Sequence, residues 1–274
     1  MIARFPMYDW PELKEQHTAM WQHLAAVLRE DLPAELAVPE TLARDGDIVQ
    51  QWCSPSLLVG QTCGLPFAQG LYKQTTLLGS PVYRLEDCLT GDYYSVIVAA
   101  PGVDVAGIRL EGVEAVAEPG SKLRAAVNAT DSQSGFSALL HSLAKFSLSE
   151  VYVSGSHRAS VQMLAAGEAD IASIDAVSWA LAQRYEPTAQ GLQVIGLSEP
   201  TPCLPMISGV SEYARQISRS LMRGIASLDE SLKADLLLEG LVQRSTSEYL
   251  FLSPRLAGAM QKHGLTEVSV QATA

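Results

Sequence analysis

The chain has 274 residues, which is enough for one large domain or two lobes with a substantial core. Hydrophobic residues make up 47% of it and charged residues only 18%, a composition that excludes intrinsic disorder. The 19 Lys and Arg residues and 30 Asp and Glu residues give a net charge of −11, so we expect no nucleic-acid partner. No stretch reaches the roughly 18 uncharged apolar residues of a membrane span, and we expect no membrane insertion.

The N-terminal residues and the cysteines bear on location and on metal sites. Residues 1–9 lack a basic start, an apolar stretch and a small-residue cleavage site, so we expect a cytoplasmic protein, or a periplasmic one if a leader has been removed. The four cysteines show no C-x-x-C spacing: Cys53, Cys63, Cys88 and Cys203. We therefore predict reduced thiols, no metal site and no cofactor.

The first part of the chain alternates predicted strands and helices, which indicates a parallel sheet covered by helices. One helix has a well-defined start, because Asp9 is a candidate N-cap, Pro11 lies in the first turn and Glu12 completes a capping box. The predicted strands are 2–5, 36–38 and 57–61, the predicted helices are 11–29 and 45–52, and a hairpin is predicted over 76–84.

A second region has its own alternation and predicts a second α/β lobe. Its predicted strands are 93–100, 123–127, 151–154, 171–174 and 192–197, and its predicted helices are 134–146, 156–166 and 176–184. From Ser211 onward the apolar residues recur at helical spacing. We therefore expect residues 1–91 and 199–274 to form the first lobe and 92–198 the second, with two connecting segments as the hinge.

A polar turn precedes the helix predicted over 134–146. Either Ser132 or Ser134 can cap this helix, whose free N–H groups and positive dipole end would then attract an anion. Gly135 lies in the same turn. The alternative is a well-capped helix with no ligand, since serine caps are common.

Three further polar segments lie at helix starts or strand ends. His157 follows Ser154 and Ser156, either of which can cap the next helix, and its imidazole is placed to donate to an anion or to be an ordinary surface histidine. Asp175 ends a buried strand, where it can face a ligand or cap the following helix. The segment 61–64 ends a strand of the first lobe, and Gly64 there permits close approach of the backbone.

These segments occur in an order that resembles the phosphate, phosphite and phosphonate substrate-binding proteins of ABC transporters. The motifs that carry the resemblance are P-M-Y-D-W over 6–10, Q-T-C-G over 61–64, Asn128 with D-S-Q-S-G over 131–135, G-S-H over 155–157 and G-E-A-D over 167–170. The resemblance covers about residues 2–262 and implies an α/β, two-lobed, type 2 periplasmic-binding-protein-like fold with an interlobe ligand cleft. It also implies the ligand-binding residues Tyr8, Gln61, Thr62, Cys63, Ser132, Ser134, Gly135, His157 and Asp175.

The favoured function is a solute-binding protein that closes on a small oxyanion, such as phosphate, phosphite or a phosphonate, with an ABC permease as its partner. The alternative is a cytoplasmic enzyme or sensor on the same fold that acts on a small anionic metabolite. Ser132, His157 and Asp175 have the residue types of a nucleophilic triad, and Cys63 with His157 those of a thiol pair. Since no G-x-S-x-G elbow is present and the serines lie in a capping turn, we favour binding over catalysis.

Overall fold

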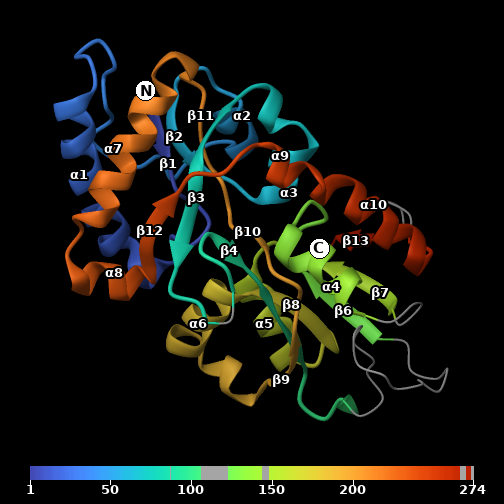
Figure 1. The fold of residues 1–274 in the computed structure, drawn as a ribbon. Coiled ribbons are helices and arrows are strands. Elements are labelled where there is room, and N and C mark those ends of the chain that lie inside the picture. Colours follow the sequence, from blue (N-terminus) through green and yellow to red (C-terminus); the bar gives the residue numbers. More distant parts are fainter. Residues whose placement is uncertain (87, 106–122, 144–147, 266–269, 273–274) are drawn as a thin grey trace. The chain divides into compact units, whose positions relative to one another are not determined.

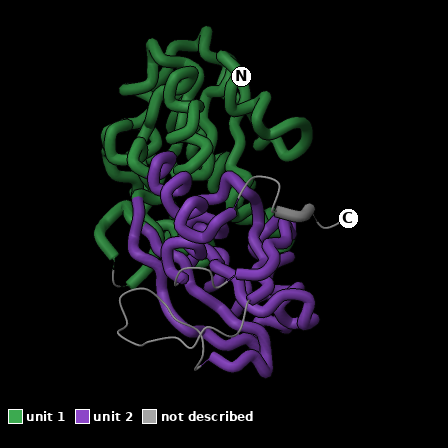
Figure 2. Tube along the Cα trace, turned by 90° about the vertical axis from the view of Figure 1, so that its right-hand side faces the viewer, with its two compact units in different colours: residues 1–92, 202–251 green, residues 93–201, 252–274 purple. Residues whose placement is uncertain are grey.

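The chain folds around two main β-sheets (Figure 1). The fold is a computed structural model that describes residues 1–86, 88–105, 123–143, 148–265 and 270–272. Two compact units divide the chain (Figure 2): unit 1 comprises Met1–Asp92 and Pro202–Phe251, and unit 2 comprises Tyr93–Thr201 and Leu252–Ala274. The connecting strands β4 (Asp92–Tyr93) and β10 (Thr201–Pro202) pair in a small sheet of their own.

Unit 1 is built on a mixed five-stranded sheet in the order β1-β2-β11-β3-β12. Its strands β1 and β2 are parallel, and the other neighbours are antiparallel. The strands are β1 (Ile2–Arg4), β2 (Leu57–Gln61), β3 (Thr76–Tyr83), β11 (Met206–Ser208) and β12 (Leu238–Val242). The helices are η1 (Pro11–Leu13), α1 (Lys14–Asp31), α2 (Ile48–Trp52), α3 (Gly64–Gln69), η2 (Leu71–Lys73), η6 (Ser211–Tyr213), α7 (Ala214–Ala226), α8 (Glu230–Leu236) and α9 (Ser247–Leu250).

The core of unit 1 lies between its sheet and the helices α1 and α7, which run side by side (Figure 1). Apolar side chains three or four residues apart put one face of α1 into this core, as the periodicity predicts. Gly224 lets α7 approach α1 closely, because a Cβ atom there would lie 2.7 Å from a methyl group of Leu24. The packed pair shares this core with residues of the sheet, among them Val59 of β2 and Leu78 of β3.

Unit 2 is built on a six-stranded sheet in the order β13-β7-β6-β8-β5-β9. The four strands from β13 to β8 are parallel, and β5 runs antiparallel to β8 and β9. The strands are β5 (Ser95–Ala99), β6 (Leu123–Val127), β7 (Leu148–Val153), β8 (Ile171–Asp175), β9 (Gln193–Leu197) and β13 (Val270–Ala272). The helices are η4 (Gln133–Ser137), α4 (Ala138–Ser142), α5 (His157–Ala165), α6 (Ala176–Tyr185), η5 (Pro187–Gly191) and α10 (Leu252–His263).

The C-terminal segment differs from the sequence-based division of the chain. We expected 199–274 to stay in the first lobe, but Leu252–Ala274 belongs to unit 2, so the chain passes between the units three times instead of twice. The reason is that α10 packs on α4. A ring N–H of His263 donates to the carbonyl of Leu140, and one of His141 donates to that of Arg255.

Four local predictions in unit 1 are wrong for identifiable reasons. Asp9 does not cap a helix, because its carboxylate pairs with Arg44. Residues 36–38 form no strand, because the chain turns there with the Leu36 N–H bonded to the Pro33 carbonyl. The expected hairpin over 76–84 is the single strand β3, whose partners β11 and β12 come from far along the chain. The expected C-terminal helical pattern contains β12, which begins after Leu237 turns the backbone to a φ of 55°.

The helix predicted over 134–146 has a different start and end. It consists of the π-helical turn η4 followed by α4, and it ends at Ser142 because Leu143 is extended. The remainder of that prediction, 144–146, lies outside the described residues.

Candidate functional site

The serine-rich turn of unit 2 connects β6 to η4. Ser132 is its N-cap, because its hydroxyl accepts the N–H of Gly135 at 2.9 Å. The N–H of Ser137 then reaches the carbonyl of Ser132, five residues back, which makes the turn a π-helix. Turns of this kind are rare in proteins, and those that occur are often found at functional sites.

Gly135 is required in this turn for steric reasons. A Cβ atom at this position would lie 1.8 Å from the side-chain oxygen of Asn128, so the Asn128 side chain would have to move to make room for it. Its N–H group is taken up by Ser132. The prediction that Gly135 binds a ligand therefore stays a prediction, whereas its role in shaping the turn follows from the geometry.

His157 and Ser134 lie together at the starts of two helices. Ser156 caps α5 by accepting the N–H of Ala159 at 3.0 Å, and His157 is the first residue of that helix. Its Nε2 atom lies 2.9 Å from the hydroxyl of Ser134, which in turn lies 3.5 Å from the hydroxyl of Ser132. The structure thus brings together three of the predicted site residues.

The His157 ring is uncharged at neutral pH. Burial lowers the pKa of His157 to about 4, and its Nδ1 atom is buried without a hydrogen-bond partner among the described residues. From β8, Ser173 donates to the carbonyl of Ser134 at 2.6 Å and so fixes the turn against the sheet. The arrangement offers neutral hydroxyl and imidazole groups, which can donate to an anion without a Lys or Arg side chain.

Asp175 ends β8 and caps α6. One of its carboxylate oxygens accepts the N–H of Ser178 at 2.9 Å, and the residue is 1% exposed. The structure therefore assigns the capping role that the sequence offered as an alternative. Contact between Asp175 and a ligand stays a prediction.

The predicted loop of unit 1 begins at the end of β2. Gln61 donates from its side chain to the hydroxyl of Tyr83 at 3.0 Å, and its carbonyl accepts the indole N–H of Trp52. The N–H of Thr62 donates to the carbonyl of Pro205 at 3.1 Å, and the residue is fully buried. Cys63 is the N-cap residue of α3 and is partly exposed, but its side chain does not cap the helix.

Tyr8 follows β1 and is joined to Gln61 through Tyr83. The rings of Tyr8 and Tyr83 meet edge to face, with their centroids 5.1 Å apart and their planes at 84°. The carbonyl of Tyr8 accepts a hydrogen bond from Nε2 of His17 at 2.9 Å. Sequence reasoning missed His17 and Tyr83, although His17 interrupts an otherwise apolar helix face and could have been noticed for that reason.

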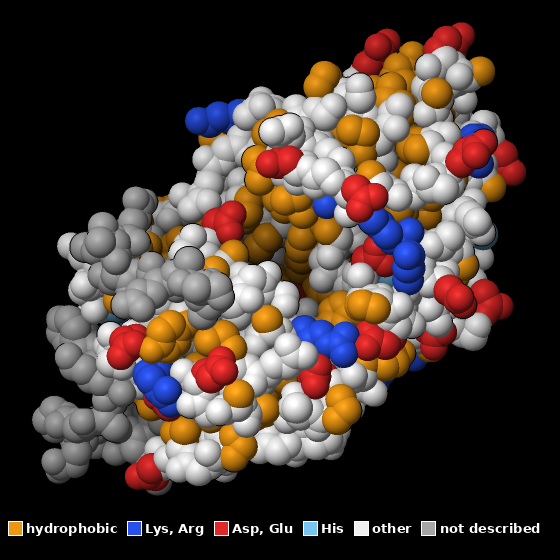
Figure 3. Space-filling view, turned by 180° about the vertical axis from the view of Figure 1, so that it is seen from behind, with side chains coloured by type: hydrophobic (Ala, Val, Ile, Leu, Met, Phe, Trp, Pro, Cys, Tyr) orange, Lys and Arg blue, Asp and Glu red, His pale blue; other side chains and the backbone are white. Residues whose placement is uncertain are grey.

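Within the residues that the structure describes, no group of three or more His, Cys, Asp or Glu side chains could hold a metal ion. On the face seen in Figure 3, most Lys and Arg side chains lie next to Asp or Glu side chains instead of forming a basic patch. None of the described helices is both long enough and apolar enough to cross a membrane.

Comparison with known proteins identifies the family. The chain matches, over residues 5–246, the model of the periplasmic substrate-binding proteins of phosphonate ABC transporters. It belongs to this family. The resemblance seen in the sequence is therefore confirmed, whereas a search of curated proteins found no match.

Solved structures of this substrate-binding fold resemble the chain over nearly its whole length. PhnD1 from Prochlorococcus marinus, in complex with methylphosphonate, is 13% identical with a TM-score of 0.66 and covers 95% of this chain and 98% of its own. A binding-protein component of an ABC phosphonate transporter from Pseudomonas aeruginosa is 13% identical with a TM-score of 0.69, covering 95% and 87%. MatC from Rhodopseudomonas palustris, with bound malate, is 9% identical with a TM-score of 0.59, covering 95% and 98%. These similarities confirm the two-lobed α/β fold.

Proposed function

We propose that this substrate-binding protein binds a small phosphonate or a related phosphorus oxyanion and delivers it to an ABC permease in the periplasm. The family supports the transport role, and PhnD1, a solved structure of similar fold, is in complex with methylphosphonate. The observation that carries the proposal is the 2.9 Å contact between Ser134 and His157 at two helix starts. These groups and Ser132 would donate to the phosphonate oxygens.

The same residues argue for binding instead of catalysis. A serine nucleophile needs a base that is oriented by a third group, usually a carboxylate bonded to the far ring nitrogen. That nitrogen, Nδ1 of His157, has no hydrogen-bond partner among the described residues, and the carboxylate of Asp175 caps α6. The Ser134 hydroxyl is thus better suited to donating to an anion than to attacking a substrate.

The ligand class follows from the combination of neutral donors with one buried acid. A buried carboxylate near an oxyanion repels it unless the ligand carries a proton or a positive group. If Asp175 faces the ligand, it favours a protonated phosphate or phosphonate, or an aminophosphonate, over sulfate, which carries no proton at neutral pH. We therefore expect sulfate to bind more weakly than either phosphorus anion.

Titration calorimetry of the purified protein tests this function. We expect methylphosphonate and phosphate to bind, and Ser134→Ala to weaken the binding at least about tenfold, because a hydrogen bond to a charged group is worth about 1.5 to 3 kcal/mol. The matched control is Ser137→Ala, in the same turn and fully buried, which should stay within about threefold of the wild type. Binding of malate without either phosphorus anion would contradict the proposal.

A further inference from the structure

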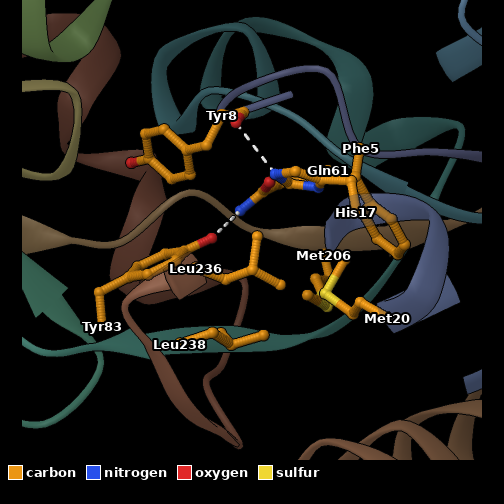
Figure 4. Close-up of a pocket in the computed structure, with 9 residues that line it drawn as sticks. All are labelled: Phe5, Tyr8, His17, Met20, Gln61, Tyr83, Met206, Leu236 and Leu238. Atoms are coloured by element: carbon orange, nitrogen blue, oxygen red, sulfur yellow. Dashed lines mark hydrogen bonds between the residues drawn. The ribbon is translucent and has the colours of Figure 1, made fainter. Parts of the chain in front are cut away.

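A small cavity of about 20 Å³ lies inside unit 1 (Figure 4). Apolar side chains, among them Met20, Met206 and Leu238, line most of it. Polar side chains complete the lining, namely those of His17 and Gln61. Tyr8 also lines it, so the cavity adjoins a predicted ligand-binding residue.

His17 projects from α1 and is 6% exposed. Its Nε2 atom is 2.9 Å from the carbonyl oxygen of Tyr8 (Figure 4). A carbonyl can only accept, so Nε2 carries the proton and Nδ1 carries a lone pair. Burial lowers the pKa of His17, against the opposing effects of Asp9 and the Tyr8 carbonyl, so the neutral ring is the form present at neutral pH.

Burying the lone pair on Nδ1 makes histidine energetically unfavourable at position 17. Nδ1 is buried and has no hydrogen-bond partner among the described residues. Such a group costs about 1 to 3 kcal/mol when it is not satisfied. The cavity has room for one water molecule, which would donate to Nδ1. An apolar residue at position 17 would avoid this cost, so the bond to Tyr8 is what distinguishes histidine here.

The loop that carries Tyr8 is held at several points. The carbonyl of Tyr8 accepts the N–H of Trp10 at 2.8 Å in addition to His17. Next to it, the carboxylate of Asp9 pairs with Arg44 at 2.6 Å. Together these contacts fix the backbone, and the edge-to-face contact with Tyr83 fixes the ring.

We propose that His17 is a positioning residue for ligand binding: it holds the backbone of Tyr8 so that the Tyr8 side chain is presented to the phosphonate in a single orientation. The proposal rests on the proposed function, because it requires Tyr8 to contact the ligand. A pre-ordered loop loses less conformational freedom on binding, and affinity rises accordingly. His17 would act entirely through Tyr8, without contacting the ligand.

Two substitutions separate positioning from simple packing. His17→Leu places an apolar side chain in the cavity wall and removes the hydrogen-bond donor, whereas His17→Gln retains an N–H near the position of Nε2. Measured by calorimetry with methylphosphonate, His17→Leu should weaken binding at least about tenfold and His17→Gln should restore it to within about threefold. Leu24→Ala is the control, because Leu24 is 1% exposed on the same helix and its truncation lowers stability without touching the loop.

Hydrogen–deuterium exchange of residues 7–10 provides a readout that needs no ligand. We expect faster exchange in His17→Leu, but not in His17→Gln or Leu24→Ala. Wild-type affinity in His17→Leu, or a loss no larger than that in Leu24→Ala, would overturn the proposal. If the wild type binds no anion, the proposed function fails, and unchanged exchange in His17→Leu would then overturn the positioning role as well.

Discussion

Acidification should destabilise the protein through His157. Burial lowers the pKa of this ring from 6.5 to about 4, so between these values the unfolded chain takes up a proton that the folded chain does not. The stability contributed by the neutral ring is therefore complete above pH 6.5 and is lost as the pH falls towards 4. From pH 7 to pH 5 the loss amounts to at most about 2 kcal/mol, because over this range the unfolded chain takes up nearly one proton at this ring that the folded chain does not.

Urea unfolding followed by circular dichroism at pH 7 and pH 5 measures this loss. Burial also lowers the pKa of His17 and of His141, so the informative quantity is the difference in acid sensitivity between the wild type and His157→Gln. The variant should lose up to about 2 kcal/mol less than the wild type on acidification. His23→Gln is the control, because His23 lies on the surface and bonds to the hydroxyl of Ser227. Equal acid sensitivity of the wild type and His157→Gln would refute the reasoning.

Two further substitutions test the turn and the support of α5. Gly135→Ala places a Cβ atom 1.8 Å from the side-chain oxygen of Asn128. It should therefore lower the free energy of unfolding by about 1 to 3 kcal/mol in urea and weaken methylphosphonate binding. Gly191→Ala is the control and should do neither, because a Cβ atom there has nothing within 4 Å. Burial opposes the ionisation of Glu186, but hydrogen bonds that include one from Arg158 outweigh it and lower the pKa of Glu186 to about 2. Glu186→Gln should therefore lower the free energy of unfolding by about 2 to 3 kcal/mol at neutral pH, and by progressively less as the pH falls from 4.5 towards 2. A difference in stability between the variant and the wild type that does not change with pH would contradict this.

The parts of the fold that could be predicted are those set by nearby residues. The sequence predicts a cap at Ser132 or Ser134 and another at Ser154 or Ser156, because a cap joins groups only three residues apart, and the structure has Ser132 and Ser156 in these roles. The missed strand β12 depends on its pairing with β3, more than a hundred residues away along the chain, and its short apolar pattern fits a helix equally well. Likewise, nothing local shows that Asp9 pairs with Arg44 instead of capping a helix.

In the candidate site, too, some residues could be predicted from the sequence and others could not. The resemblance placed Ser132, Ser134 and His157 in one site, and the structure brings these three together. The supporting residues His17 and Tyr83 carry no motif, because their roles arise from a hydrogen bond and a ring contact that exist only in the folded chain. Supporting residues therefore had to be read from the structure.

Asp175 shows that capping and ligand binding are not exclusive alternatives. Capping α6 uses one lone pair of one carboxylate oxygen, and an ionised carboxylate has about four such sites. The cap therefore fixes the carboxyl group of Asp175 at the end of β8, close in sequence to Ser173, which holds the turn of Ser134. If an anion binds at that turn, the charge of Asp175 is best tolerated when the ligand presents a proton to it, and this favours a phosphorus oxyanion over sulfate.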